Sequence, residues 1–79
     1  MTFKAAYDYA MCNSEIFRAH DARVKEAQKN GIPSACLIFS VEPNQTFYYG
    51  FDGVNIQSGK HRPARSLYLL NREEVLIIL

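Results

Sequence analysis

The 79 residues suffice for one domain, 1–79, and their 48% share of hydrophobic residues excludes intrinsic disorder. A net charge of +1 excludes a whole-chain electrostatic attraction to nucleic acid or to an anionic membrane surface. Binding to either would therefore require a local patch of charge.

Residues 2–30 carry the signals of helical structure. Thr2 is a suitable N-cap for a first helix, and Ser14 for a second helix that runs to about Asn30. Because Pro33 cannot continue a helix, and the Asn-Gly pair before it tolerates the left-handed conformation, we expect the helical segment to end there. The pattern fits either one kinked helix or two separate helices.

A first strand is predicted at residues 35–41, where Leu37, Phe39 and Val41 alternate onto one face. The turn that follows needs an odd number of residues, because an even number would scramble the faces of the next strand. We therefore expect a three-residue loop at 43–45. It pairs hydrophobic residues of the two strands on the core face: Val41 with Phe47, Phe39 with Tyr49, and Leu37 with Phe51.

The stretch from Thr46 to Gln57 contains the clearest hairpin signal of the chain. Asp52 and Gly53 stand between two runs rich in aromatic and β-branched residues, and both tolerate the positive φ angles of a two-residue turn. This turn would set the register of the two strands, with Phe51 opposite Val54, Tyr49 opposite Ile56 and Phe47 opposite Ser58.

The C-terminal part of the chain contains one predicted strand, at 66–70, and one ambiguous segment, at 71–79. Asn71 and Glu74 form a capping box that favours a short helix, whereas the β-branched residues that follow favour a strand, and we expect the helix. The complete pattern predicts an α+β fold. In this fold, an N-terminal helical segment packs on a three- to four-stranded antiparallel meander sheet.

No motif in the sequence supports catalysis. Gly53–Lys60 has the glycines of a phosphate loop at the wrong spacing, and it follows a hairpin. His20 and Asp21 are helix neighbours that point in different directions, so we expect a packed or surface histidine beside a solvated aspartate. Nothing places a histidine beside Cys36 to activate it. The sequence therefore predicts a non-enzyme without a metal ion or a cofactor.

The cysteines and the N-terminal segment indicate a cytoplasmic location without membrane interaction. Cys12 and Cys36 match neither a disulfide framework nor a zinc pattern, so we expect free thiols, with one disulfide as the alternative. The N-terminal segment contains Asp8 and lacks the apolar run of a signal peptide. No segment approaches the roughly 20 apolar residues that span a bilayer.

The sheet face turned away from the core is the first candidate for binding. Ile38, Tyr48, Asn55 and Gln57 are predicted to share it, and a rigid aromatic side chain in a polar surround is typical of an interface hot spot. The alternative is that the C-terminal segment or a helix covers this face. The apolar tail 76–79 is likewise either core or the seam of a homo-oligomer.

A local positive cluster is the second candidate. It comprises Lys60, His61, Arg62 and Arg65 in the loop after the second hairpin. With an exposed aromatic ring nearby, such a loop can hold a phosphate backbone and stack a base. The alternative is a solvated loop that keeps the chain soluble.

The sequence therefore predicts a small protein-binding module whose partner is a larger protein. The length and the absence of motifs are typical of accessory proteins of phages or mobile elements, which inhibit a larger partner by binding and blocking it. The alternative function is nucleic-acid binding through the loop 60–65.

Overall fold

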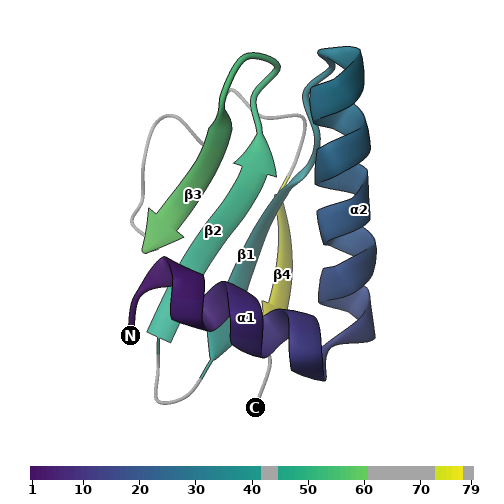
Figure 1. The fold of residues 1–79 in the computed structure, drawn as a ribbon. Coiled ribbons are helices and arrows are strands. Elements are labelled where there is room, and N and C mark those ends of the chain that lie inside the picture. Colours follow the sequence, from purple (N-terminus) through teal and green to yellow (C-terminus); the bar gives the residue numbers. More distant parts are fainter. Residues whose placement is uncertain (42–44, 61–72, 78–79) are drawn as a thin grey trace.

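The computed structural model describes residues 1–41, 45–60 and 73–77. The helices α1 (Phe3–Asn13) and α2 (Glu15–Asn30) precede the strands β1 (Cys36–Val41), β2 (Gln45–Phe51), β3 (Ile56–Lys60) and β4 (Glu73–Ile77). The strands lie in the order β3-β2-β1-β4, with α1 across the sheet and α2 along its side (Figure 1). The predicted α+β class with a helical N-terminal segment is confirmed.

Ser14 separates the two helices. Its N–H donates the last hydrogen bond of α1, to the carbonyl oxygen of Ala10 at 2.9 Å, and its extended backbone, with φ −137° and ψ 115°, ends that helix. Its hydroxyl oxygen accepts a hydrogen bond from the N–H of Phe17 at 3.0 Å, which caps α2. Residues 2–30 therefore form two helices joined by one residue. As predicted, α2 ends at Asn30, and its C-cap residue Gly31 takes the left-handed conformation with φ 69°.

The pairing of β1 with β2 confirms the predicted faces but not the predicted register. Phe39 lies opposite Phe47, and Val41 opposite Gln45, so each residue of β1 is paired two positions earlier than predicted. Three residues separate Val41 from Gln45, so the predicted odd loop length is correct. The loop begins one residue earlier than predicted. A shift of two preserves every face, so burial could not distinguish the two registers. The observed register places Phe39 opposite Phe47, and their rings stack with centroids 5.7 Å apart.

The turn between β2 and β3 is longer than the predicted two residues. Asp52 Oδ1 accepts hydrogen bonds from the N–H groups of Val54 at 2.8 Å and Asn55 at 2.7 Å. The N–H of Asp52 donates to the carbonyl oxygen of Asn55 at 3.2 Å, so residues 52–55 form a four-residue loop. Phe51 consequently pairs with Ile56 rather than with Val54. The two-residue turn was wrong because the aspartate side chain, and not only its backbone, closes this turn.

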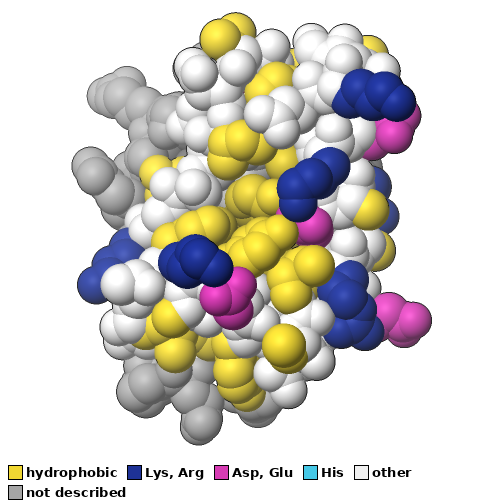
Figure 2. Space-filling model, viewed as in Figure 1, with side chains coloured by type: hydrophobic (Ala, Val, Ile, Leu, Met, Phe, Trp, Pro, Cys, Tyr) yellow, Lys and Arg dark blue, Asp and Glu magenta, His cyan; other side chains and the backbone are white. Residues whose placement is uncertain are grey.

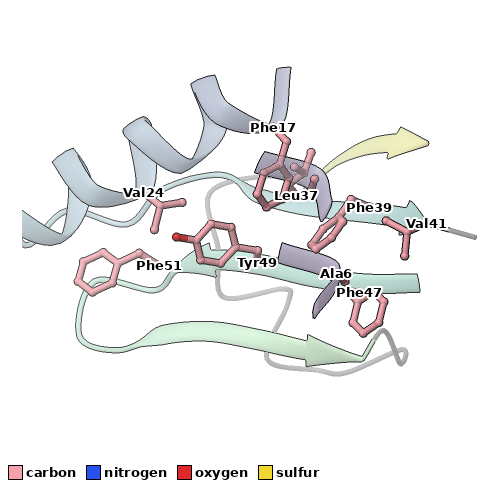
Figure 3. Packing of buried hydrophobic residues seen from close by; sticks show 10 residues of the cluster. Ala6, Phe17, Val24, Leu37, Phe39, Val41, Phe47, Tyr49 and Phe51 are labelled. Atoms are coloured by element: carbon pink, nitrogen blue, oxygen red, sulfur yellow. The ribbon is translucent and has the colours of Figure 1, made fainter. Parts of the chain in front are cut away.

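The hydrophobic core lies between the helices and one face of the sheet (Figure 3). Phe17 of α2 is completely buried, and its ring centroid lies 4.7 Å from that of Phe39. On α1, Ala6 and Ala10 are also fully buried, and their small side chains allow a close approach to the sheet. The core residues of β1 and β2 are the six that the sequence placed on this face: Leu37, Phe39, Val41, Phe47, Tyr49 and Phe51.

The segment 73–77 is a strand, which corrects the predicted short C-terminal helix over that range. β4 runs parallel to β1, with Cys36 opposite Glu73 and Ser40 opposite Ile77. The sheet is therefore mixed: β1, β2 and β3 form the predicted antiparallel meander, and β4 adds a parallel strand. Backbone pairing with β1 outweighs the local capping signal of two side chains. The fourth strand predicted at 66–70 lies outside the described residues.

Candidate functional site

A buried carboxylate joins both helices to the sheet. Asp21 of α2 is only 7% exposed. Its Oδ1 accepts hydrogen bonds from the hydroxyl groups of Tyr7 on α1 and Tyr49 on β2, both at 2.7 Å. The ammonium group of Lys25 lies 3.1 Å from each carboxylate oxygen. One side chain thereby connects three elements of the fold.

The hydrogen bonds keep Asp21 ionised in spite of its burial. Burial by itself raises the pKa of Asp21, but the hydrogen bonds from Tyr7, Tyr49 and Lys25 outweigh it, and the pKa lies below its ordinary value. Burial, followed by the hydrogen bond to Asp21, raises the pKa of both tyrosines, so both hydroxyl groups stay protonated as donors. The hydrogen bond to Asp21 likewise raises the pKa of Lys25. A carboxylate with a lowered pKa is a poor general base. The hydrogen bonds of Asp21 hold α1, α2 and β2 together.

His20 takes the packed one of its two predicted environments, whereas Asp21 is not the solvated aspartate that was expected. His20 is 1% exposed, and its Nε2 lies 2.8 Å from the carbonyl oxygen of Tyr49. Asp21 is buried because tyrosine hydroxyl groups from two other elements meet it. A signal was present in the sequence: Tyr49 falls on the predicted core face, and a buried tyrosine hydroxyl needs a partner.

The described residues contain no group of three or more His, Cys, Asp or Glu side chains that could hold a metal ion. Cys12 and Cys36 are free thiols, the first exposed and the second buried. No helix in the described ranges is long and apolar enough to cross a membrane. The predicted lack of catalysis stays a prediction, since none of these observations tests it.

The four residues predicted for the outer sheet face do not form one exposed patch. Ile38 and Tyr48 lie directly opposite each other on that face, but Ile38 is buried with Cys36 and is only 8% exposed. Ile38 packs in one cluster with Cys36 and Tyr48, so it is less accessible than a contact residue of an open face would be. Tyr48 is half-buried, and Gln57 is half-buried and donates to Asp52 Oδ2 at 2.8 Å. Asn55 is exposed, but it lies in the loop before β3.

The positive cluster of the sequence is described only at its first member. Lys60 is the last residue of β3, and it is exposed. His61, Arg62 and Arg65 lie outside the described residues. The hypothesis of nucleic-acid binding through this loop therefore stays a prediction.

The end of α2 and the turn between β2 and β3 lie at the same end of the molecule (Figure 1). An exposed apolar tip is found there. It comprises Ile32, Val54 and Ile56, which are 59%, 79% and 37% exposed. Two hydrogen bonds between Ser34 and Phe51, of 2.8 Å and 2.9 Å, hold the segment after α2 against the end of β2.

The two sides of the apolar tip are also in close contact. A Cβ atom placed on Gly53 would lie 3.2 Å from Cγ of Pro33, so the loop 52–55 and the segment after α2 touch each other. Sequence reasoning missed this surface because the predicted two-residue turn placed Val54 opposite Phe51, on the core face. The four-residue loop moves Val54 out of the strand and into solvent.

A pocket adjoins the apolar tip. It has a volume of about 680 Å³ and lies between α2 and the segment 32–35. Its described lining includes Ala27, Ile32 and Pro33 as apolar side chains and Arg23 and Glu26 as charged ones. Ile32 belongs to both the pocket and the apolar tip, so the two are continuous.

A second apolar region is visible on the face that carries the helices. Figure 2 shows hydrophobic side chains gathered at the centre of this face, with Lys, Arg, Asp and Glu side chains around them. Tyr7 and Phe3 of α1 are partly buried against the core, and the ammonium group of Lys25 lies 5.9 Å from the centroid of the Tyr7 ring. A cation over an aromatic face adds a modest stabilisation to the buried carboxylate network.

Comparison with protein-family models, with curated proteins and with solved structures finds no match for the chain. The function is therefore argued from the geometry of the surfaces described above.

Proposed function

We propose that this protein is a small non-enzymatic protein-binding module, and that its contact surface is the apolar tip with the adjoining pocket. The observation that carries the proposal is the position of Val54. It is 79% exposed in a loop whose backbone is fixed by the carboxylate of Asp52. An exposed apolar side chain on an ordered loop contributes little to the stability of the fold. It is suited to contact with another protein.

The order of the loop favours binding because little conformational entropy remains to be lost. Association costs an ordering term for each loop and side chain that becomes fixed in the complex. In the loop 52–55, the hydrogen bonds of Asp52 with Val54 and Asn55 already order the backbone in the free protein, so little backbone entropy is lost on binding. A partner would therefore meet a preformed surface.

The apolar tip alone is too small for tight binding. The exposed fractions of Ile32, Val54 and Ile56 together amount to less than two whole side chains, which corresponds to about 3–5 kcal/mol of burial. Association costs about 4–15 kcal/mol before any contact is counted. A partner must therefore also fill the pocket between α2 and the segment 32–35, where Arg23 and Glu26 provide charged contacts.

Occupation of a partner's surface is the mode of action of small inhibitor and accessory proteins. We therefore extend the proposal to a blocking role against a larger protein. The structural use of Asp21, whose Oδ1 accepts hydrogen bonds from Tyr7, Tyr49 and Lys25, supports a role through binding. The proposed phage or mobile-element origin rests on the length of the chain and the absence of motifs.

The proposal is tested by photocrosslinking in a host lysate. A photoreactive amino acid at Val54 is expected to trap a defined protein, whereas the same amino acid at exposed Gln28 on α2 traps none in common with it. Unmodified protein should compete with the trapping. Val54→Asp should weaken capture of the trapped protein at least about tenfold and change the free energy of unfolding by less than about 0.5 kcal/mol.

The matched control is Gln28→Asp, which adds the same charge to an exposed position of α2 and should leave capture unchanged. Identical crosslinks from positions 54 and 28, or undiminished capture by Val54→Asp, would show that the apolar tip is not the binding surface.

A further inference from the structure

β3 is the outermost strand on its side of the described sheet, in which the order is β3-β2-β1-β4. Among residues 1–41, 45–60 and 73–77, only β2 pairs with β3. The direction of the backbone groups along β3 follows from the hydrogen bonds at the end of β2.

The hydrogen bonds of Phe51 fix this direction. Its carbonyl oxygen accepts from the N–H of Ser34, and its N–H donates to Ser34 Oγ, so both groups of Phe51 point toward the β1 side of the sheet. Hydrogen-bonded and non-hydrogen-bonded pairs alternate along an antiparallel ladder. The pairs Gly50–Gln57 and Tyr48–Gly59 are therefore the hydrogen-bonded ones.

The hydrogen bond from Asp52 to Asn55 agrees with this assignment, because it continues the same alternation into the loop. The backbone groups of Ile56, Ser58 and Lys60 consequently point away from β2, along the outer edge of β3. The side chains of these three residues are also exposed, whereas Gln57 and Gly59 between them are half-buried. One strand edge thus combines outward backbone groups with exposed residues at the same positions.

We propose that β3 accepts an extended segment of a partner protein as an additional antiparallel strand, with an acidic side chain opposite Lys60 and an apolar side chain opposite Ile56. This inference rests on the proposed protein-binding function and names the form of the partner. Addition of a strand supplies main-chain hydrogen bonds for affinity, while alternate side chains supply specificity. The segment would continue past Ile56 onto the apolar tip, so both surfaces form one interface.

Charge complementarity favours a partner over a second copy of this chain. Antiparallel pairing of β3 with itself about Ser58 would place Lys60 opposite Ile56 twice, so each ammonium group would face an apolar side chain. Cross-strand pairs of this kind contribute less than opposite charges or two apolar side chains. A lysine at an edge is also a common protection against self-pairing.

The probe for this inference is a synthetic seven-residue peptide of threonines in which glutamate precedes valine by four positions. In antiparallel addition this spacing places glutamate opposite Lys60 and valine opposite Ile56. At millimolar peptide, nuclear magnetic resonance should show shifts and slowed hydrogen exchange for the amides of Ile56, Ser58 and Lys60. The exchange rates of the inward amides of Gln57 and Gly59 should change much less.

Two variants of the protein test the backbone and the charge separately. Ser58→Pro removes an outward N–H without removing a hydrogen bond to β2, and it should abolish the peptide effects while the fold is retained. Lys60→Glu should weaken binding of the glutamate peptide about fivefold or more and favour the same peptide with lysine in place of glutamate. Lys29→Glu makes the same change of charge at the end of α2 and should have little effect.

The inference fails if no amide of β3 responds at millimolar peptide, if the inward amides respond as strongly as the outward ones, or if the lysine peptide binds equally well. Its failure is distinguishable from that of the apolar tip. Val54→Asp should leave binding of the short peptide intact, because the peptide ends opposite Ile56. Loss of crosslinking at position 54 with a normal peptide response would therefore reject the apolar tip alone.

Discussion

Replacement of Asp21 by asparagine is expected to lower the free energy of unfolding by about 2–4 kcal/mol. The change keeps the shape of the side chain but removes the charge to which the hydroxyl groups of Tyr7 and Tyr49 donate at 2.7 Å. A hydrogen bond to a charged group contributes about 1.5–3 kcal/mol. Because the amide oxygen still accepts a hydrogen bond, only part of this contribution is lost. Lys25 is exposed, and its ion pair with Asp21 adds about 1 kcal/mol at most.

Urea unfolding at neutral and at low pH measures this effect. The pKa of Asp21 in the folded state lies below its ordinary value of 3.8. Its contribution to stability is therefore complete above about pH 5 and is lost as the pH falls through the folded-state pKa. The loss of stability at low pH should be correspondingly smaller in Asp21→Asn than in the unmodified protein.

Asp8 provides a matched control for Asp21. It lies 3.1 Å from Lys4, also four residues away on a helix, but both side chains are more than half exposed. Asp8→Asn should change the free energy of unfolding by about 0.5 kcal/mol or less. Equal costs for Asp8→Asn and Asp21→Asn, or an unchanged dependence on pH in Asp21→Asn, would refute the role given to the buried carboxylate. Coupling of Asp21→Asn with Tyr49→Phe should be detectable in a double-mutant cycle.

Three further variants or modifications test other parts of the fold. Ser14→Ala should cost about 1 kcal/mol in urea unfolding through the lost helix cap, and Ser14→Asp should restore most of it; a neutral alanine would show that the cap is not needed. Gly50→Ala would place a Cβ 2.9 Å from the carbonyl oxygen of Ala35, so we expect a loss of about 1–3 kcal/mol, and an unchanged melting temperature would contradict this packing. In the native protein a thiol reagent should modify exposed Cys12 rapidly and buried Cys36 only after unfolding, which mass spectrometry can follow; equal rates would contradict the burial of Cys36.

The faces of the strands were predictable from the sequence, whereas the registers were not. Alternation determines which side of the sheet Phe39 and Tyr49 occupy, and burial penalises every shift by one residue. A shift by two residues keeps the alternation, so the choice between such registers depends on details of the turn. At Asp52 the decisive detail is a side-chain oxygen that accepts two backbone hydrogen bonds. Sequence patterns report that an aspartate favours a turn, but they do not report its length.

The buried network and the fourth strand were missed for a different reason: both depend on contacts between distant segments. In the sequence, Asp21 stands four residues before Lys25, which is the spacing of an ordinary ion pair on a helix. Its burial depends on Tyr7 and Tyr49, which lie 14 and 28 residues away. The strand Glu73–Ile77 is likewise stabilised by pairing with β1. Residues that favour a local helix cap carry no information about pairing with a distant strand.

The single residue between the helices has a consequence for how this fold tolerates insertions and deletions. Each residue of an α-helix advances the chain by about 100° of rotation. Because Ser14 alone connects α1 to α2, the rotational phase of one helix sets that of the other. A residue added within α2 just after Ser14 would turn the following residues by about 100° and carry Phe17 and Asp21 away from the sheet. Substitutions at this junction should therefore be tolerated far better than any change in its length.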